Sequence, residues 1–131
     1  MNADNEPLAP PLAEDQVGLV VEVFRMLADA TRVQVLWALV DRELSVNDLA
    51  GHIGKPAPSV SQHLSKLRMA RLVRTRRAGT TIFYSLENEH VRQLVVDAVY
   101  NAEHAGPGIP PHHRGVSAVR ELPTRDRAVS E

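Results

Sequence analysis

Positive charge is concentrated in one segment of this 131-residue chain. Between Lys55 and Leu86 the sequence has seven basic residues and no acidic one, although the formal net charge of the whole chain is −1. The seven bases are Lys55, Lys66, Arg68, Arg71, Arg74, Arg76 and Arg77. Binding to phosphate requires positive charge that no neighbouring carboxylate neutralises. The segment therefore favours a surface that contacts a polyanion over an ordinary solvated face.

The rest of the composition excludes several classes of protein. The chain has no cysteine, which rules out disulfides, thiolate metal sites and cysteine nucleophiles. Its apolar runs are too short to span a bilayer, so no membrane partner is expected. The first 24 residues contain five acids and no base, the reverse of a secretory signal. These features predict a cytoplasmic protein.

Helical spacing of apolar residues predicts the elements that must position the basic segment. The first helix is expected over residues 14–28, and Asp29 can cap a second one. Ser45 can cap a short third helix that ends at Gly54, and a fourth helix is expected over 58–69. Asn88 can cap a last helix, which is stopped by the Gly-Pro-Gly sequence at 106–108.

A β-hairpin is expected between the fourth helix and the last. Apolar and polar side chains roughly alternate along residues 72–77, and residues 80–86 are rich in β-branched and aromatic side chains. Gly79, between them, suits a tight turn. The order ααααββα is that of a winged helix-turn-helix, a mainly α fold with one hairpin (α+β). We expect a flexible arm over residues 1–12, this domain over 13–105, and a mobile, histidine-containing tail over 106–131.

The fourth helix has the two faces of a DNA recognition helix. Val60, Leu64 and Leu67 share one face, which is expected to point into the core. The other positions carry short hydroxyls and an amide, which can reach base edges, and a lysine, which suits a phosphate. The predicted DNA contacts are Ser59, Ser61, Gln62, His63 and Lys66 on this helix, and Arg74, Arg76 and Arg77 on the hairpin. His63 is equally compatible with a place at the edge of the core.

Three ordered blocks of sequence resemble the ArsR/SmtB family of metal-responsive repressors. Residues 26–32 (MLADATR) resemble its first-to-second helix signature, and residues 59–68 (SVSQHLSKLR) its recognition helix. Residues 77–80 (RAGT) with 83–86 (FYSL) resemble its wing. The resemblance covers about residues 14–105. It implies a homodimer built on the first and last helices, which binds double-stranded operator DNA without metal and is released when metal binds.

The resemblance also implies where a metal would bind. The family's site on the last helix corresponds to Asn88, His90, Asn101 and His104, so two of its four positions hold asparagine, a weak ligand. The family's cysteine site corresponds to Ser45 and Asn47 and is therefore absent. Glu103 and the tail residues His112 and His113 are the neighbours that can replace the missing ligands.

The spacing of the two helical histidines requires a second chain. His90 and His104 lie on one stripe of a helix but about 21 Å apart along its axis. If two last helices pack antiparallel in a dimer, His90 approaches the partner's His104. The predicted ligands are His90, Glu103, His104, His112 and His113. They offer only nitrogen and oxygen donors, which suit Ni²⁺ or Co²⁺, with Zn²⁺ as the alternative. This pattern resembles the nickel- and cobalt-sensing, KmtR-like branch of the family.

Two other hypotheses remain open at this point. In the first, the chain is a repressor of the same family that senses zinc or a non-metal cue. In the second, it is a protein-interaction module that docks through its last helix. The asparagines at positions 88 and 101 favour the former. An enzyme is not expected, because the sequence has no nucleophile–base pair and no phosphate-binding loop.

Overall fold

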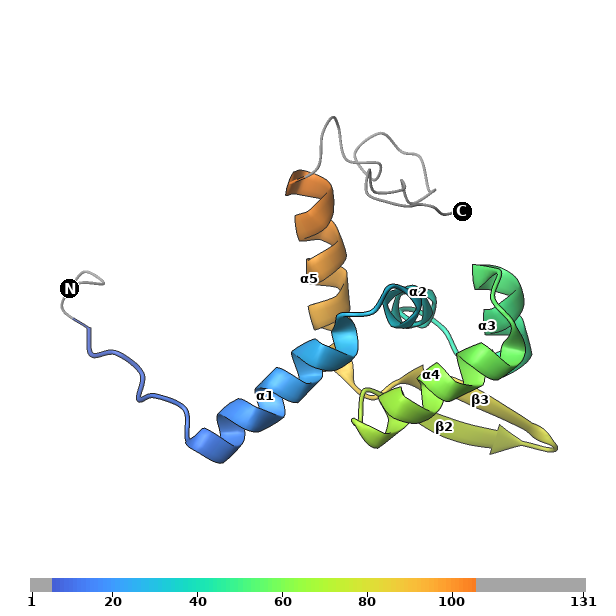
Figure 1. Cartoon of the computed structure of the whole chain (residues 1–131), viewed down its shortest axis with the longest axis horizontal. Coiled ribbons are helices and arrows are strands. Elements are labelled where there is room, and N and C mark those ends of the chain that lie inside the picture. Colours follow the sequence, from blue (N-terminus) through green and yellow to red (C-terminus); the bar gives the residue numbers. More distant parts are fainter. Residues whose placement is uncertain (1–5, 106–131) are drawn as a thin grey trace.

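The computed structural model describes residues 6–105 and contains five helices and three strands within that range (Figure 1). The elements in chain order are α1 (Glu14–Leu27), α2 (Ala30–Ala38), β1 (Leu44–Ser45), α3 (Val46–Ile53), α4 (Ala57–Met69), β2 (Val73–Ala78), β3 (Thr81–Leu86) and α5 (Glu89–Ala105). The order confirms the predicted winged helix-turn-helix. The predicted tail, 106–131, lies outside the described residues. None of the helices between residues 6 and 105 is long and apolar enough to cross a membrane.

The hydrophobic core lies between α2, α3, α4, the sheet and the first half of α5. Val60, Leu64 and Leu67 are each fully buried, which confirms the predicted inner face of α4. The other buried apolar residues are Val35, Leu36, Leu39, Leu49, Ala50, Leu72, Val73, Leu86, Val91 and Val95. Because aliphatic burial is the main favourable term in folding, this cluster fixes how α4 sits against the rest of the domain.

The helix caps form as the sequence predicted. The Asp29 carboxylate accepts a hydrogen bond from the backbone N–H of Arg32 (3.0 Å) at the start of α2. The Ser45 hydroxyl accepts from the N–H three residues later (3.2 Å), and α3 ends at Gly54, whose φ of 70° is left-handed. The Asn88 amide oxygen accepts from the N–H of Val91 (3.0 Å) at the start of α5. Each contact satisfies a backbone donor that the first turn of a helix leaves unpaired.

The sheet contains the predicted hairpin and one strand that was not predicted. β2 and β3 pair antiparallel from Val73 opposite Leu86 to Ala78 opposite Thr81, and Gly79 takes a positive φ of 64° in the turn. The additional strand, β1, pairs with β3, so the strand order is β1-β3-β2. With only two residues, β1 is too short to show the alternation by which a strand is recognised in sequence.

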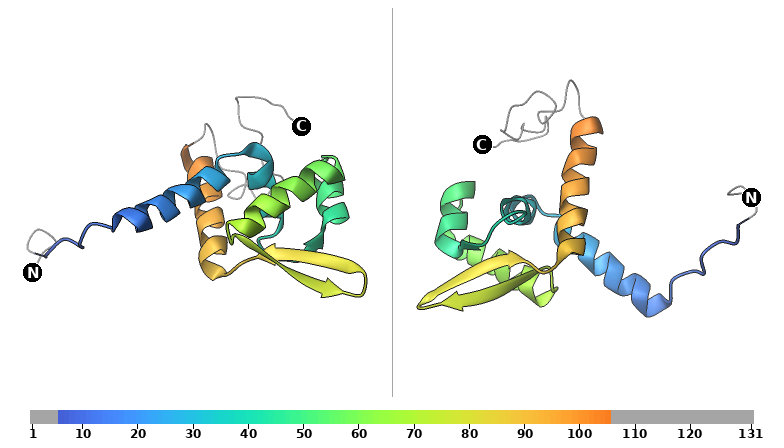
Figure 2. Two further views of the ribbon diagram at one scale, coloured as in Figure 1. Left: turned by 60° about the horizontal axis from the view of Figure 1, so that its bottom comes forward. Right: turned by 180° about the vertical axis from the view of Figure 1, so that it is seen from behind.

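Two helices extend beyond the packed part of the chain, as Figures 1 and 2 show from three sides. Helix α1 contains no buried residue, and its exposed apolar side chains include Leu19 (71% exposed) and Phe24 (58%). In α5 the buried residues are Val91 and Val95, both in the first half, while Tyr100 is exposed. Both helices therefore carry apolar side chains that the rest of residues 6–105 leaves exposed.

Candidate DNA interface and metal-binding helix

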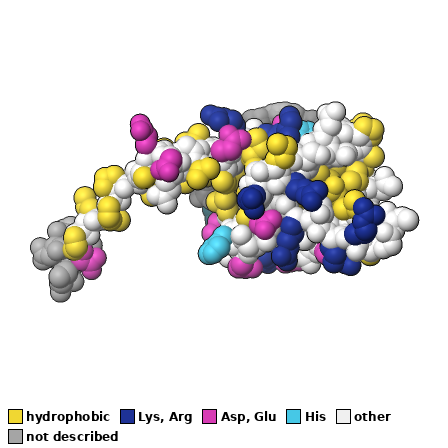
Figure 3. Space-filling view, turned by 90° about the horizontal axis from the view of Figure 1, so that it is seen from below, with side chains coloured by type: hydrophobic (Ala, Val, Ile, Leu, Met, Phe, Trp, Pro, Cys, Tyr) yellow, Lys and Arg dark blue, Asp and Glu magenta, His cyan; other side chains and the backbone are white. Residues whose placement is uncertain are grey.

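The outer face of α4 is polar and accessible. Gln62 and Lys66 are exposed, and Ser59 and Ser61 are partly buried at its edges. Helix α3 packs against α4 and leaves that face open. Figure 3 looks onto the side that lies at the bottom of Figure 1 and shows Lys and Arg side chains spread over the part formed by α4 and the hairpin. Because α4 contacts β2, the predicted contacts of the helix and those of the hairpin lie on adjoining elements.

The three hairpin arginines differ in their surroundings. The Arg76 guanidinium donates hydrogen bonds to both carboxylate oxygens of Glu43 (2.8–3.2 Å) and lies over the ring of Phe83, 5.1 Å from its centre. These hydrogen bonds hold the pKa of the Glu43 carboxyl below its usual value. Arg74 and Arg77 are exposed, and within the described residues neither forms an ion pair. Of the three arginines, Arg77 thus keeps uncompensated charge for phosphate, while Arg74 forms no direct ion pair but shares the neighbourhood of Glu43 with Arg76.

His63 lies at the inner edge of α4. Its Nδ1 atom is 3.3 Å from Nη1 of Arg32 and 3.8 Å from a carboxylate oxygen of Asp29, and its side chain is 20% exposed. The ring therefore contacts the start of α2, as expected for a histidine at the edge of the core. A DNA contact through the opposite edge of the ring remains a prediction.

The Asp29 carboxyl in this cluster is held ionised. Burial raises its pKa, but the backbone hydrogen bond from Arg32 and the charges of Arg32 and His63 outweigh that effect. The pKa of Asp29 consequently lies below its usual value. The charged form both caps α2 and faces the basic side chains next to it.

The predicted metal ligands on α5 lie near opposite ends of one continuous helix. His90 is in the first turn and His104 in the last, both exposed, and Glu103 is partly buried. Within residues 6–105 no three His, Cys, Asp or Glu side chains come together in a group that could hold a metal ion. His112 and His113 lie outside the described residues. A site that uses His90 and His104 together must therefore draw on two chains.

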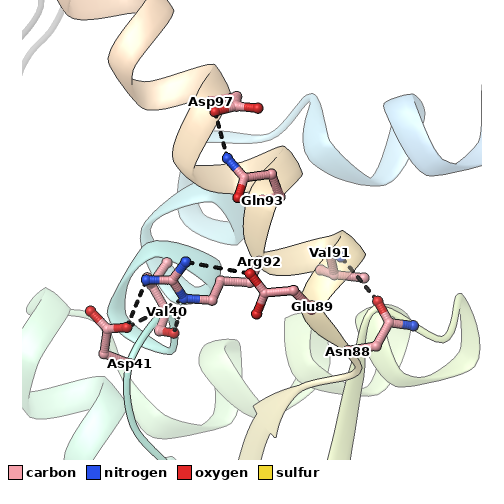
Figure 4. Close-up of polar contacts among 8 residues, drawn as sticks. All are labelled: Val40, Asp41, Asn88, Glu89, Val91, Arg92, Gln93 and Asp97. Atoms are coloured by element: carbon pink, nitrogen blue, oxygen red, sulfur yellow. Dashed lines mark hydrogen bonds and ion pairs between the residues drawn. The ribbon is translucent and has the colours of Figure 1, made fainter.

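The first turn of α5, which carries His90, is hydrogen-bonded to the segment that follows α2 (Figure 4). The Arg92 guanidinium donates to the backbone carbonyl of Val40 (3.2 Å) and to the Asp41 carboxylate (3.0 and 3.3 Å). It also lies 3.7 Å from the carboxylate of Glu89. The hydrogen bond to Asp41 raises the pKa of Arg92, which stays charged. The sequence did not predict this connection, because the paired residues are about fifty positions apart.

A helix with an open polar face, a second helix packed behind it and a basic hairpin beside it define the winged helix-turn-helix class of DNA-binding proteins. The comparisons with known proteins narrow this class to a family. Residues 29–75 match the model of the bacterial regulatory protein, arsR family.

Two transcriptional regulators of Mycobacterium tuberculosis are similar over most of their length. KmtR is 75% identical over 122 residues, which cover 93% of this chain and 92% of KmtR. NmtR is 38% identical over 109 residues, covering 83% of this chain and 90% of NmtR. The chain belongs to the ArsR family.

A solved structure supports the same assignment. The homodimeric winged helix-turn-helix DNA-binding domain of a Mycobacterium bovis protein superposes with a TM-score of 0.64 at 29% identity. The superposition covers 74% of this chain and 93% of that domain. The similarity therefore extends over the whole winged helix-turn-helix and beyond the segment that the family model matches.

Proposed function

We propose that this protein is a transcriptional repressor that binds operator DNA as a homodimer and releases it on binding nickel or cobalt. The observation that carries the proposal is the division of the described residues into a packed DNA-reading part and a histidine-bearing α5 whose buried residues, Val91 and Val95, lie in its first half. The 75% identity to KmtR extends over nearly the whole chain and supports a common function. Membership of the ArsR family supports the DNA-binding part of the proposal independently.

The DNA contacts follow from the chemistry of the exposed side chains. Ser59, Ser61 and Gln62 carry groups that can exchange hydrogen bonds with base edges when α4 lies in the major groove. Lys66 suits a phosphate. Arg74 and Arg77 on the slim hairpin suit the backbone or a narrow minor groove, where the potential is negative. Arg76 joins them only if it leaves Glu43, so its contribution is the smallest of the three.

The homodimer follows from the uncovered apolar surface. Helix α1 has no buried residue, and Leu19 and Phe24 are more than half exposed. Tyr100 is exposed on the second half of α5. A second copy of the chain can cover both helices at once, since a two-fold interface pairs the same surface from each copy. Such a dimer also sets the separation of the two α4 helices along the DNA.

The donors on α5 fit a metal shared by two chains. His90 and His104 are both accessible, and antiparallel α5 helices bring His90 of one chain to the partner's His104. Glu103, His112 and His113 are the further donors, and none of the five is a thiolate. Bound Ni²⁺ or Co²⁺ would supply a bridge that holds the dimer in one geometry. Release of DNA requires the ion to bind the DNA-free form more tightly, by about 1–3 kcal/mol or more.

The test starts with an operator selected by the metal-free protein from a library of random-sequence duplexes. Gel-shift titrations of that operator with nickel, cobalt and zinc then measure the metal response. We expect nickel or cobalt to weaken binding by roughly 5–150-fold or more. The His90→Ala variant should lose this response, and His52→Ala, an exposed histidine on α3, should keep it. Full affinity at saturating metal would contradict the metal response, and failure to enrich any sequence would contradict operator binding.

A repressor of the same family that responds to zinc or to a non-metal cue is the second candidate. The observation in its favour is that Asn88 uses its amide oxygen to cap α5. The residue at this family ligand position is therefore explained by helix capping alone. The same titrations separate the two candidates, because this one predicts release by zinc only or by none of the three metals.

A further inference from the structure

Arg32 is the only charged side chain in the described part of the chain that is buried, with 9% of its surface exposed. A buried guanidinium is tolerated only where its donors are paired. Its Nε donates to the backbone carbonyl of Met26 at 2.7 Å, and its Nη1 lies 3.3 Å from Nδ1 of His63. The Asp29 carboxylate, 4.0 Å from Nη1, adds a weaker ion pair.

These contacts join three helices with different roles. Met26 is in the last turn of α1, the helix that buries no residue of its own. Arg32 is in the first turn of α2, which follows α1 directly (Figure 2). His63 is in the middle of α4, the helix that carries the DNA-reading face. The last turns of α1 also pack against the core through Val23, Met26 and Leu27, and the guanidinium adds a polar link from α1 to α4.

The link also bears on which ring nitrogen of His63 carries the hydrogen, because Nδ1 is the atom that faces the guanidinium. A guanidinium has donors and no acceptor. The short Arg32–His63 contact is therefore a hydrogen bond only if Nδ1 accepts, which leaves the hydrogen of the neutral ring on Nε2. The ring is partly exposed, so α4 can present this Nε2–H to a phosphate or to an acceptor on a base edge.

We propose that Arg32 is a positioning residue for DNA reading, which acts through His63. It fixes His63 as the Nε2–H tautomer and ties α4 to the carboxyl end of α1. A displacement of α1 in the dimer then reaches α4 through this guanidinium. The inference rests on the proposed function, in which α1 forms the dimer and α4 reads DNA.

The first test measures the tautomer in the metal-free and DNA-free protein. Long-range ¹H–¹⁵N spectra of the His63 ring at about pH 8, above the usual range of histidine, should show the hydrogen on Nε2. In Arg32→Lys the two tautomers should mix, whereas Arg25→Lys, an exposed arginine on α1, should change nothing. Hydrogen on Nδ1 in the wild type, or an unchanged spectrum in Arg32→Lys, would overturn the proposal. Neither result depends on DNA binding.

The second test uses a double-mutant cycle on the selected operator. Arg32→Lys and His63→Phe should each weaken binding by about tenfold, the cost of one hydrogen bond to a charged group. The double variant should be little weaker than His63→Phe alone, because Arg32 acts through that ring. Losses that simply add would overturn the proposal, as would no loss in either single variant.

One further pair of variants keeps the cycle decisive if Arg32→Lys is poorly folded. In His63→Asn the amide oxygen takes the place of Nδ1, so the contact with Arg32 is kept and the outward donor is lost. His63→Phe loses both. Thermal unfolding should show His63→Asn to be the more stable of the two, and equal stability would contradict the Arg32–His63 contact. A wild-type protein that binds no DNA would instead overturn the proposed function and leave the tautomer result standing.

Discussion

The two halves of this molecule differ in what one chain provides for them. The DNA-reading half, from α2 to β3, contains most of the buried core and shows its polar face already assembled on α4. The regulatory half consists of α1, which has no fully buried residue, and α5, whose buried residues lie in its first half. The first half is held by packing within the chain, whereas the proposed dimer would complete the packing of the second.

The largest effect is expected in the core of the reading half. Leu64 is fully buried in α4, so Leu64→Ala leaves a cavity and should lower the free energy of unfolding by about 2–5 kcal/mol. Met69→Ala, at the exposed end of the same helix, is the matched control and should change stability little. Denaturant unfolding measures both. Equal losses would show that α4 is not held by its inner face.

A smaller effect, on assembly, is expected in the regulatory half. Phe24→Glu places a charge on the apolar face of α1 and should weaken dimerisation by about 2–4 kcal/mol, the range for a central aromatic contact. The circular dichroism of the folded chain should persist, because Phe24 is 58% exposed within one chain. Sedimentation velocity measures the dimer, and Arg25→Glu on the next residue is the control. A dimer unaffected by Phe24→Glu would place the interface elsewhere.

In the hairpin, the salt dependence of DNA binding should change more when an arginine without an ion-pair partner is replaced than when Arg76, which pairs with Glu43, is replaced. Arg77→Gln removes an exposed, unpaired cation and should lower the slope of log affinity against log salt by about 1. Arg76→Gln should lower it less, because Glu43 already balances that charge. Salt-titrated fluorescence anisotropy on the selected operator measures both slopes. A greater effect of Arg76→Gln would mean that Arg76 leaves Glu43 when DNA binds.

The smallest effect is expected at the junction of the two halves. The pKa of Asp29 is lowered in the folded protein, so its ionisation stabilises the fold above the ordinary aspartate pKa of about 3.9. That contribution is lost as the pH falls through the lower pKa of the folded state. Asp29→Asn keeps a capping side chain but removes the charge, and should flatten this part of the stability–pH curve. An unchanged acid limb in thermal unfolding would contradict the assignment.

The sequence correctly predicted those features of the fold that depend on a single helix. The inner face of α4 follows from its helical period, and the caps at Asp29, Ser45 and Asn88 follow from local side-chain chemistry. It could not find the contacts of Arg76 with Glu43, since these residues are 33 positions apart and only β1, which escaped prediction, brings them together. Pairs this distant in the chain are fixed by tertiary packing and leave no periodic signal.

The orientation of the His63 ring and the set of metal ligands also depend on contacts outside the helix that carries them, so the sequence alone could not determine them. The period of α4 placed His63 at the edge between core and surface, but it could not show that Nδ1 lies beside the buried guanidinium of Arg32 and the Asp29 carboxylate. For α5 the spacing of His90 and His104 already indicated that one helix cannot join them, and the continuous helix agrees with that expectation. In the proposed site a second chain supplies part of the ligands, so the ligand set stays a prediction.

The most direct test of the contrast between the halves is a mixing experiment with nickel. His90→Ala and His104→Ala should each bind nickel at least about tenfold more weakly than the wild type, because each homodimer lacks one histidine of both shared sites. When the two variants are mixed and exchanged, half of the dimers are hybrids with one intact site, so about a quarter of the wild-type sites should return. Isothermal titration measures this stoichiometry. Wild-type affinity in either variant alone, or no recovery in the mixture, would contradict a site shared between two chains.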